Sequence, residues 1–78
     1  MPTVLRIGPY KFFFFSAEGR EPPHIHVGYE KYLCKIWLET LKIAEDGGLP
    51  AHRLNQILRY TKDNQQMLLD AYRTYHSN

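Results

Sequence analysis

The chain has 78 residues, a length that supports one hydrophobic core and is too short for two. Its 44% apolar and 14% aromatic content excludes a disordered chain, and its net charge of +2 falls short of the strongly positive field of a dedicated nucleic-acid binder. The single cysteine, Cys34, excludes an internal disulfide and fits a reducing compartment. We find neither a signal-peptide pattern nor the ~20 apolar residues of a membrane span. We therefore expect one cytoplasmic domain over residues 1–78, with no membrane partner.

Residues 3–38 predict a small antiparallel sheet of three to four strands. This half is rich in β-branched and aromatic residues and is interrupted by Gly and Pro. We expect strands near 3–7, 10–16, 24–29 and 32–38. The four phenylalanines at 12–15 are apolar on both faces of the pleat, so both faces of that strand need cover.

The remaining residues predict helices. We expect a short helical turn over 39–44, and Pro50 suits the first turn of a helix. Apolar residues then recur at three- and four-residue steps, which predicts one or two helices over 50–76 with Asp63-Asn64 as the expected break. The predicted fold class is α+β, with the sheet packed against these helices. A core of this size supplies only ~3–5 kcal/mol, which leaves room for a homodimer or a partner protein.

The segment Pro22-Pro23-His24-Ile25-His26-Val27 holds the strongest candidate site. Strand alternation puts His24 and His26 on one face, with Cα atoms ~7 Å apart. Such a pair can divide general acid and base work across a phosphodiester, hold one divalent transition metal, or bind an anion or a base edge. In the structural interpretation, both rings instead pack with Trp37 and Tyr10 at a half-exposed sheet edge.

Several residues could assist phosphate or RNA chemistry at this strand. Arg20 in the adjoining loop and Lys35 on the neighbouring strand are the first phosphate partners, because cations stabilise a phosphoryl transition state. Arg6 and Lys11 are the second choices, and Trp37 could stack on a base. Each cation could equally be an ordinary surface residue.

A catalytic metal would need a third protein ligand besides the two histidines. The sequence offers four uncertain candidates for it, which are Glu18, Glu21, His52 and His76. We therefore expect no cofactor, with a divalent transition metal as the alternative. Cys34 alternates with Ile36 and Leu38, which predicts a buried, inert thiol.

Five segments carry a family resemblance, namely MPTVLRIG at 1–8, YKFFFFS at 10–16, EPPHIHV at 21–27, KIWL at 35–38 and NQQMLLDAY at 64–72. With them the chain resembles domain-of-unknown-function family 4160, a group of short bacterial proteins, over nearly its whole length. Members of that family often lie in two-gene, toxin-antitoxin-like modules, so the resemblance implies an antitoxin-like partner. The chain has Glu39-Thr40 where relatives tend to show Asp-Pro.

We expect a toxin-like component of a two-gene module that acts on or binds RNA, with His24 and His26 as acid and base candidates. One alternative is a non-enzymatic module that binds a partner protein through its aromatic sheet face or its C-terminal helices. The other alternative is a metal-binding domain built on the two histidines.

Overall fold

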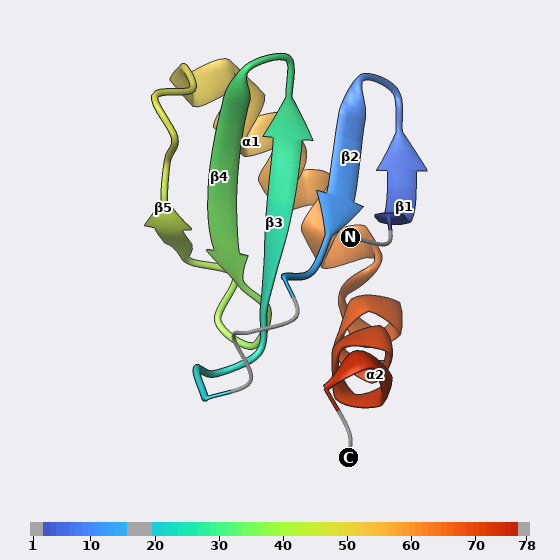
Figure 1. The fold of residues 1–78 in the computed structure, drawn as a ribbon. Coiled ribbons are helices and arrows are strands. Elements are labelled where there is room, and N and C mark those ends of the chain that lie inside the picture. Colours follow the sequence, from blue (N-terminus) through green and yellow to red (C-terminus); the bar gives the residue numbers. More distant parts are fainter. Residues whose placement is uncertain (1–2, 16–19, 77–78) are drawn as a thin grey trace.

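A computed structural model describes residues 3–15 and 20–76 of the chain. The described elements are β1 (Thr3–Ile7), β2 (Tyr10–Phe13), β3 (His24–Tyr29), β4 (Tyr32–Trp37), β5 (Ile43–Glu45), α1 (Ala51–Asp63) and α2 (Gln65–Tyr75). The strands form one antiparallel sheet in the order β1-β2-β3-β4-β5, so each strand pairs with its sequence neighbours (Figure 1). The predicted α+β class is confirmed, and the sheet has five strands where we expected three to four.

Two tight hairpins fix the register of the sheet. Ile7 pairs with Tyr10 across a two-residue loop that begins at Gly8, and Gly8 has a φ of 54° that glycine adopts without strain. Tyr29 pairs with Tyr32 across the second two-residue loop. The turns therefore lie where the sequence predicted them.

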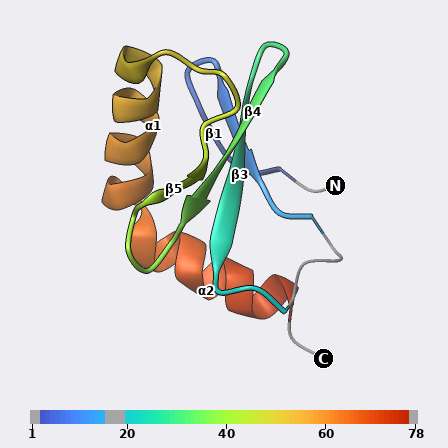
Figure 2. The same ribbon diagram turned by 90° about the vertical axis from the view of Figure 1, so that its left-hand side faces the viewer.

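Both helices pack on the same face of the sheet (Figure 2). Alternation along the strands buries one row of side chains under the helices, because Phe12, Val27 and Cys34 lie opposite one another on β2, β3 and β4. The helices contribute their own apolar stripe at three- and four-residue steps. The buried apolar residues are Tyr10, Phe12, Phe14, Ile25, Val27, Cys34, Ile36, Leu38, Leu49, Leu54, Ile57, Leu68 and Tyr72.

The expected break between two helices is confirmed at Asn64. The side-chain amide of Asn64 donates to the Tyr60 carbonyl at 2.9 Å, and the same carbonyl accepts the Asn64 backbone N–H at 3.2 Å. Gln65 starts α2 and donates its side-chain amide to the Leu38 carbonyl at 2.6 Å. This bond ties the helix junction to the chain that follows β4.

Three predicted element bounds were wrong. Strand β2 ends at Phe13 rather than at residue 16, where Ser16 itself lies outside the described residues, and β4 ends at Trp37 rather than at residue 38. The predicted helical turn over 39–44 is wrong, because the chain reverses after β4 and forms β5. The Trp37 amide donates to the Lys42 carbonyl at 2.9 Å and closes that reversal. None of the described helices is long and apolar enough to cross a membrane.

Candidate functional site: the helix-free face of the sheet

The predicted site residues gather on the sheet face that no described helix covers (Figure 2). His26 lies directly opposite Phe13 on β2 and Lys35 on β4, and His24 lies opposite Trp37. Residues opposite one another in an antiparallel pair point to the same face. We call this surface the open face. It runs along β1 to β4 and includes six of the seven predicted site residues, because Lys11 shares the parity of Phe13 and Arg6 lies opposite Lys11.

His24 is buried at the start of β3, with 2% of its surface exposed. Its Nδ1 lies 2.9 Å from the Pro22 carbonyl oxygen, which can only accept, so Nδ1 carries the proton and donates. Its Nε2 points toward Glu21, at 3.9 Å from Oε1. The ring also contacts Trp37 and Tyr72, with centroid distances of 5.8 Å and 5.7 Å. The proline clamp thus fixes both the orientation and the tautomer of this imidazole.

His26 is enclosed by phenylalanines. Its exposed fraction is 5%, and its ring centroid lies 4.4 Å from that of Phe15 and 6.0 Å from that of Phe13. The two imidazole centroids are 5.3 Å apart. The pair is therefore close together, as the alternation predicted, but both rings are covered. The structural interpretation put both rings beside Tyr10 at a half-exposed sheet edge. Strand β3 is instead the central strand of the sheet, and Tyr10 faces the helices, where its hydroxyl donates to Gln56.

Lys35 is a buried cation with an internal partner. Its Nζ donates to both carboxylate oxygens of Glu21, at 2.7 Å and 2.8 Å, and lies 4.9 Å from the centre of the Trp37 ring. Only 7% of Lys35 is exposed. A phosphate would have to displace Glu21 to reach this ammonium group, so Lys35 serves first to hold the Glu21 loop on the sheet.

Two hollows flank the buried histidines along the open face. The first has a volume of about 350 Å³ and is lined in part by Lys11, Phe13, Gly28, Lys31 and Leu33. The second has a volume of about 360 Å³ and is lined by Pro22, Pro23, Trp37, Glu39, Thr40 and Lys42. Each hollow thus combines an aromatic side chain and an exposed lysine with a glutamate, Glu30 in the first and Glu39 in the second. Trp37 is half-buried and is the aromatic residue among the lining of the second hollow, where it can stack on a ring.

The remaining predicted cations are exposed. Arg6 and Lys11 lie directly opposite each other on β1 and β2, next to the first hollow. Two like charges in this position repel each other and destabilise the pair of strands. An anion bound between them would remove that repulsion. Arg20 is also exposed, in the loop before β3.

The third ligand of a metal site does not assemble in the described part of the chain. Residues 3–15 and 20–76 contain no group of three His, Cys, Asp or Glu side chains that could hold a metal ion. Glu21 is near His24 but binds Lys35, His52 is exposed on α1, and His76 contacts the Phe15 and Tyr72 carbonyls. Glu18 lies outside the described residues.

Cys34 is buried in the core, as predicted, with 1% of its surface exposed. Burial away from water disfavours the thiolate and raises the pKa of this thiol to about 11. A thiol with so high a pKa is protonated at neutral pH and is a poor nucleophile. Cys34 is therefore a core residue on the helix side of the sheet.

Sequence reasoning missed three side chains that build the site. Glu21 was considered only as a metal ligand, and it is instead the partner of Lys35. Tyr72 reaches from α2 and donates its hydroxyl to the Glu21 carbonyl at 3.2 Å. Phe15 covers His26. Strand alternation carried a signal for Phe15, because it shares parity with Phe13, but no pattern links Tyr72 to a loop 51 residues away.

The fold and the open face define a small α+β protein with one helix-covered and one helix-free sheet face. Residues 10–73 match the family described as a domain of unknown function (DUF4160). Since this match covers most of the chain, the protein belongs to that family, and the resemblance seen in the sequence is confirmed. No curated protein and no solved structure matches the chain.

Proposed function

We propose that this protein is the toxin-like component of a two-gene module and that it binds single-stranded RNA across the open face. The observation that carries the proposal is the pair of hollows, each of which joins an aromatic ring to an exposed lysine: Phe13 with Lys11, and Trp37 with Lys42. Proteins that bind single strands combine these two elements, because bases stack on the rings and cations neutralise the phosphates.

The spacing of the hollows suits a short single strand. The Gly28–Leu33 pair lies four residue steps from the His24–Trp37 pair, which corresponds to about 13 Å along the strands. Nucleotides stack ~3.4 Å apart along a strand, so a run of several nucleotides spans that distance. Arg6 lies opposite Lys11, at the same end as the first hollow, and supplies one further phosphate contact.

The burial of His24 and His26 favours binding over cleavage. A general acid or base must come within hydrogen-bond reach of the proton that it transfers, and these imidazoles are 2% and 5% exposed. Their role in the proposal is to shape the face from below: His24 supports Trp37, and His26 supports Phe13. Acid–base chemistry would first require the Glu21 loop and Phe15 to move away.

Trp37 is the only tryptophan, so its fluorescence reports on the second hollow directly. We expect single-stranded RNA of about eight to ten nucleotides to quench the fluorescence of Trp37. The affinity should fall steeply as the salt concentration rises. Lys11→Ala should weaken binding uniformly across sequences and reduce the slope of log K against log salt by about 1. Lys62→Ala is the matched control, because Lys62 is equally exposed but lies on α1.

The outcomes separate the competing hypotheses. Quenching without cleavage supports the proposal, and so does growth inhibition in vivo that Lys11→Ala relieves. Cleavage that a folded His24→Ala, His26→Ala double variant abolishes would establish the enzymatic alternative instead. A Trp37 signal that does not change with RNA at low salt would rule out the open face as an RNA-binding surface.

A further inference from the structure

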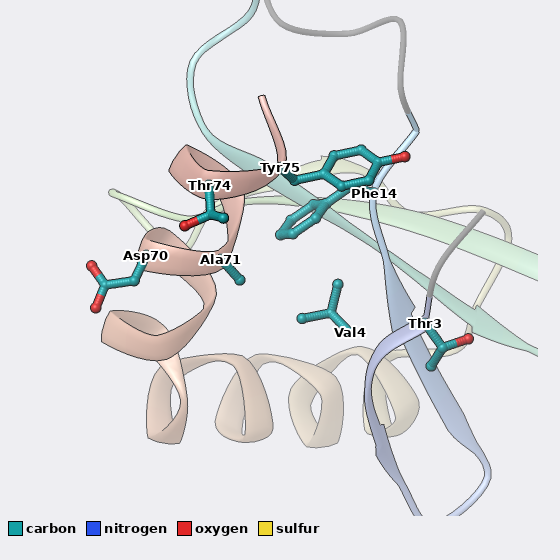
Figure 3. Close-up of a pocket in the computed structure, with 7 residues that line it drawn as sticks. All are labelled: Thr3, Val4, Phe14, Asp70, Ala71, Thr74 and Tyr75. Atoms are coloured by element: carbon teal, nitrogen blue, oxygen red, sulfur yellow. The ribbon is translucent and has the colours of Figure 1, made fainter. Parts of the chain in front are cut away.

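A third concave surface lies at the sheet edge, and its lining includes none of Trp37, His24 and His26. A cavity of about 400 Å³ opens between β1 and α2. Figure 3 shows Val4, Phe14, Ala71 and Tyr75 around its apolar interior and the Asp70 carboxylate pointing away at the rim. Apolar side chains thus line the space, and an acidic group borders it. We call this cavity the edge groove.

The edge groove adjoins a sheet edge that is open to pairing. Within the described residues β1 pairs only with β2, and in Figure 1 the sheet ends at β1. The outward backbone N–H and C=O groups of an edge strand are a template for a further strand. Because Val4 belongs to both β1 and the groove wall, every second side chain of an added strand would project over the groove.

Charge argues against a second copy of this chain as the added strand. In the register that pairs the whole of β1, two strands related by a two-fold axis would bring their Arg6 side chains within ~8 Å of each other on the open face. Each Arg6 already has Lys11 opposite it, so four cations would cluster there.

The same charges favour a heterologous strand. We propose that β1 and the edge groove bind an extended segment of a partner protein, whose alternate side chains are apolar toward the groove and acidic toward Arg6. Alternation lets one strand satisfy both sides at once. Asp70 at the rim opposes the inverted arrangement, in which the carboxylates would enter the groove. This partner surface shares Arg6 but not Trp37 with the proposed RNA-binding surface, so Trp37 fluorescence and the β1 amide signals test the two proposals separately.

A pair of synthetic nonapeptides tests the proposal on the full chain. One alternates Val and Glu, and the other replaces each Glu by Lys. We expect the Val-Glu peptide to bind, to shift the backbone amide signals of β1 and the Ala71 methyl signal in NMR spectra, and to slow hydrogen exchange at β1. The Val-Lys peptide should bind at least tenfold more weakly, since it places ammonium groups against Arg6.

Variants separate the two sides of the surface. Ala71→Lys should fill the groove and weaken the Val-Glu peptide at least tenfold, whereas Met67→Lys, on an exposed position of the same helix outside the groove, should not. Arg6→Glu should invert the preference, so that the Val-Lys peptide binds better. Circular dichroism checks that each variant folds.

Three results would overturn the proposal. They are the absence of β1 shifts at millimolar peptide, a preference that does not invert in Arg6→Glu, and a wild-type dimer in sedimentation that Ala71→Lys dissociates. The last of these would assign the edge groove to a second copy of the chain.

Discussion

The ion pair between Lys35 and Glu21 holds the loop before β3 against the sheet. The Lys35 ammonium is almost fully buried, while the Glu21 side chain is 40% exposed. We expect Glu21→Gln to lower the free energy of unfolding by about 1–2 kcal/mol, because the buried charge loses its carboxylate, and the partial exposure of Glu21 keeps the loss below that of a fully buried pair. Urea unfolding measures this change.

The matched variant is Lys35→Met, which removes the charge and keeps the apolar stem. It should cost less than Glu21→Gln, and the double variant should recover most of the Glu21→Gln loss. If the losses of unfolding free energy in the two single variants instead added up to the loss in the double variant, the ion pair would contribute no interaction energy. The Glu21 loop would then be held by other interactions, such as the hydrogen bond from the Tyr72 hydroxyl.

Strand alternation predicted which residues of the candidate site share a face but could not predict their burial. Period-two alternation put His24, His26, Lys35 and Trp37 on one face, which the register bears out. The cover over these residues comes from Phe15, from Glu21 and from Tyr72, which is 48 positions beyond His24. The Tyr72 contact leaves no local periodicity, and the fold of the Glu21 loop over the strands cannot be read from alternation, so the two imidazoles are predicted as an accessible pair and are enclosed in the fold.

At the scale of elements, β5 shows how tertiary pairing overrides local preference. Residues 39–44 contain several good helix formers, which favoured a helical turn. Leu41 instead has a φ of 62°, outside the right-handed helical region, and Ile43 pairs with Ile36 of β4. The edge of β4 supplies hydrogen-bond partners that an isolated turn lacks. The helices, whose apolar stripes span many residues, were predictable with their break for the opposite reason.

Gly47 lies in the loop between β5 and α1, close to the backbone of β4. It has a φ of 65°, and a methyl group there would overlap the carbonyl oxygen of Leu33 on β4. We expect Gly47→Ala to lower the free energy of unfolding by about 3 kcal/mol, since it adds a steric clash with backbone to the ~1 kcal/mol conformational strain. Thermal unfolding monitored by circular dichroism measures the loss.

Gly48 is the control for this prediction. Its φ of 82° imposes a similar strain, but the nearest atom to an added methyl group is 3.8 Å away, in the Tyr32 ring. Gly48→Ala should therefore cost only about 1 kcal/mol. Equal losses for the two variants would show that the loop does not lie against β4 as described.

The two faces of the sheet differ in what they bury and what they expose. The helix side buries a continuous apolar row and supplies the stability of the fold, which in a chain of this length is marginal. The open face carries hollows, exposed cations and half-buried rings, which contribute little to the free energy of unfolding. This division is why the functional proposals concern the open face and the sheet edge, whereas the core should report on folding alone.

Cys34 provides that report, because it lies in the core on the helix side of β4. A pKa of about 11 against an ordinary 9.0 lowers the thiolate fraction about 100-fold at pH 8, and burial excludes the reagent as well. We expect a thiol reagent to label native Cys34 at least ~100-fold more slowly than the urea-unfolded chain. The labelling rate should rise with urea in step with the fraction unfolded. Thr40→Cys in a Cys34→Ala background, exposed after β4, should label at once.

The same group sets the sign of an alkaline pH dependence. Between pH 9.0 and about 11 the folded chain keeps the thiol proton and the unfolded chain releases it. The stabilisation that the protonated thiol gives to the folded state is therefore fully present below pH 9.0 and is lost as the pH rises through this window. The free energy of unfolding should fall there by up to about 1.4 kcal/mol per pH unit more in the wild type than in Cys34→Ala. Identical slopes, together with rapid labelling of Cys34 without urea, would mean that the helix layer opens locally and that the core is not one cooperative unit.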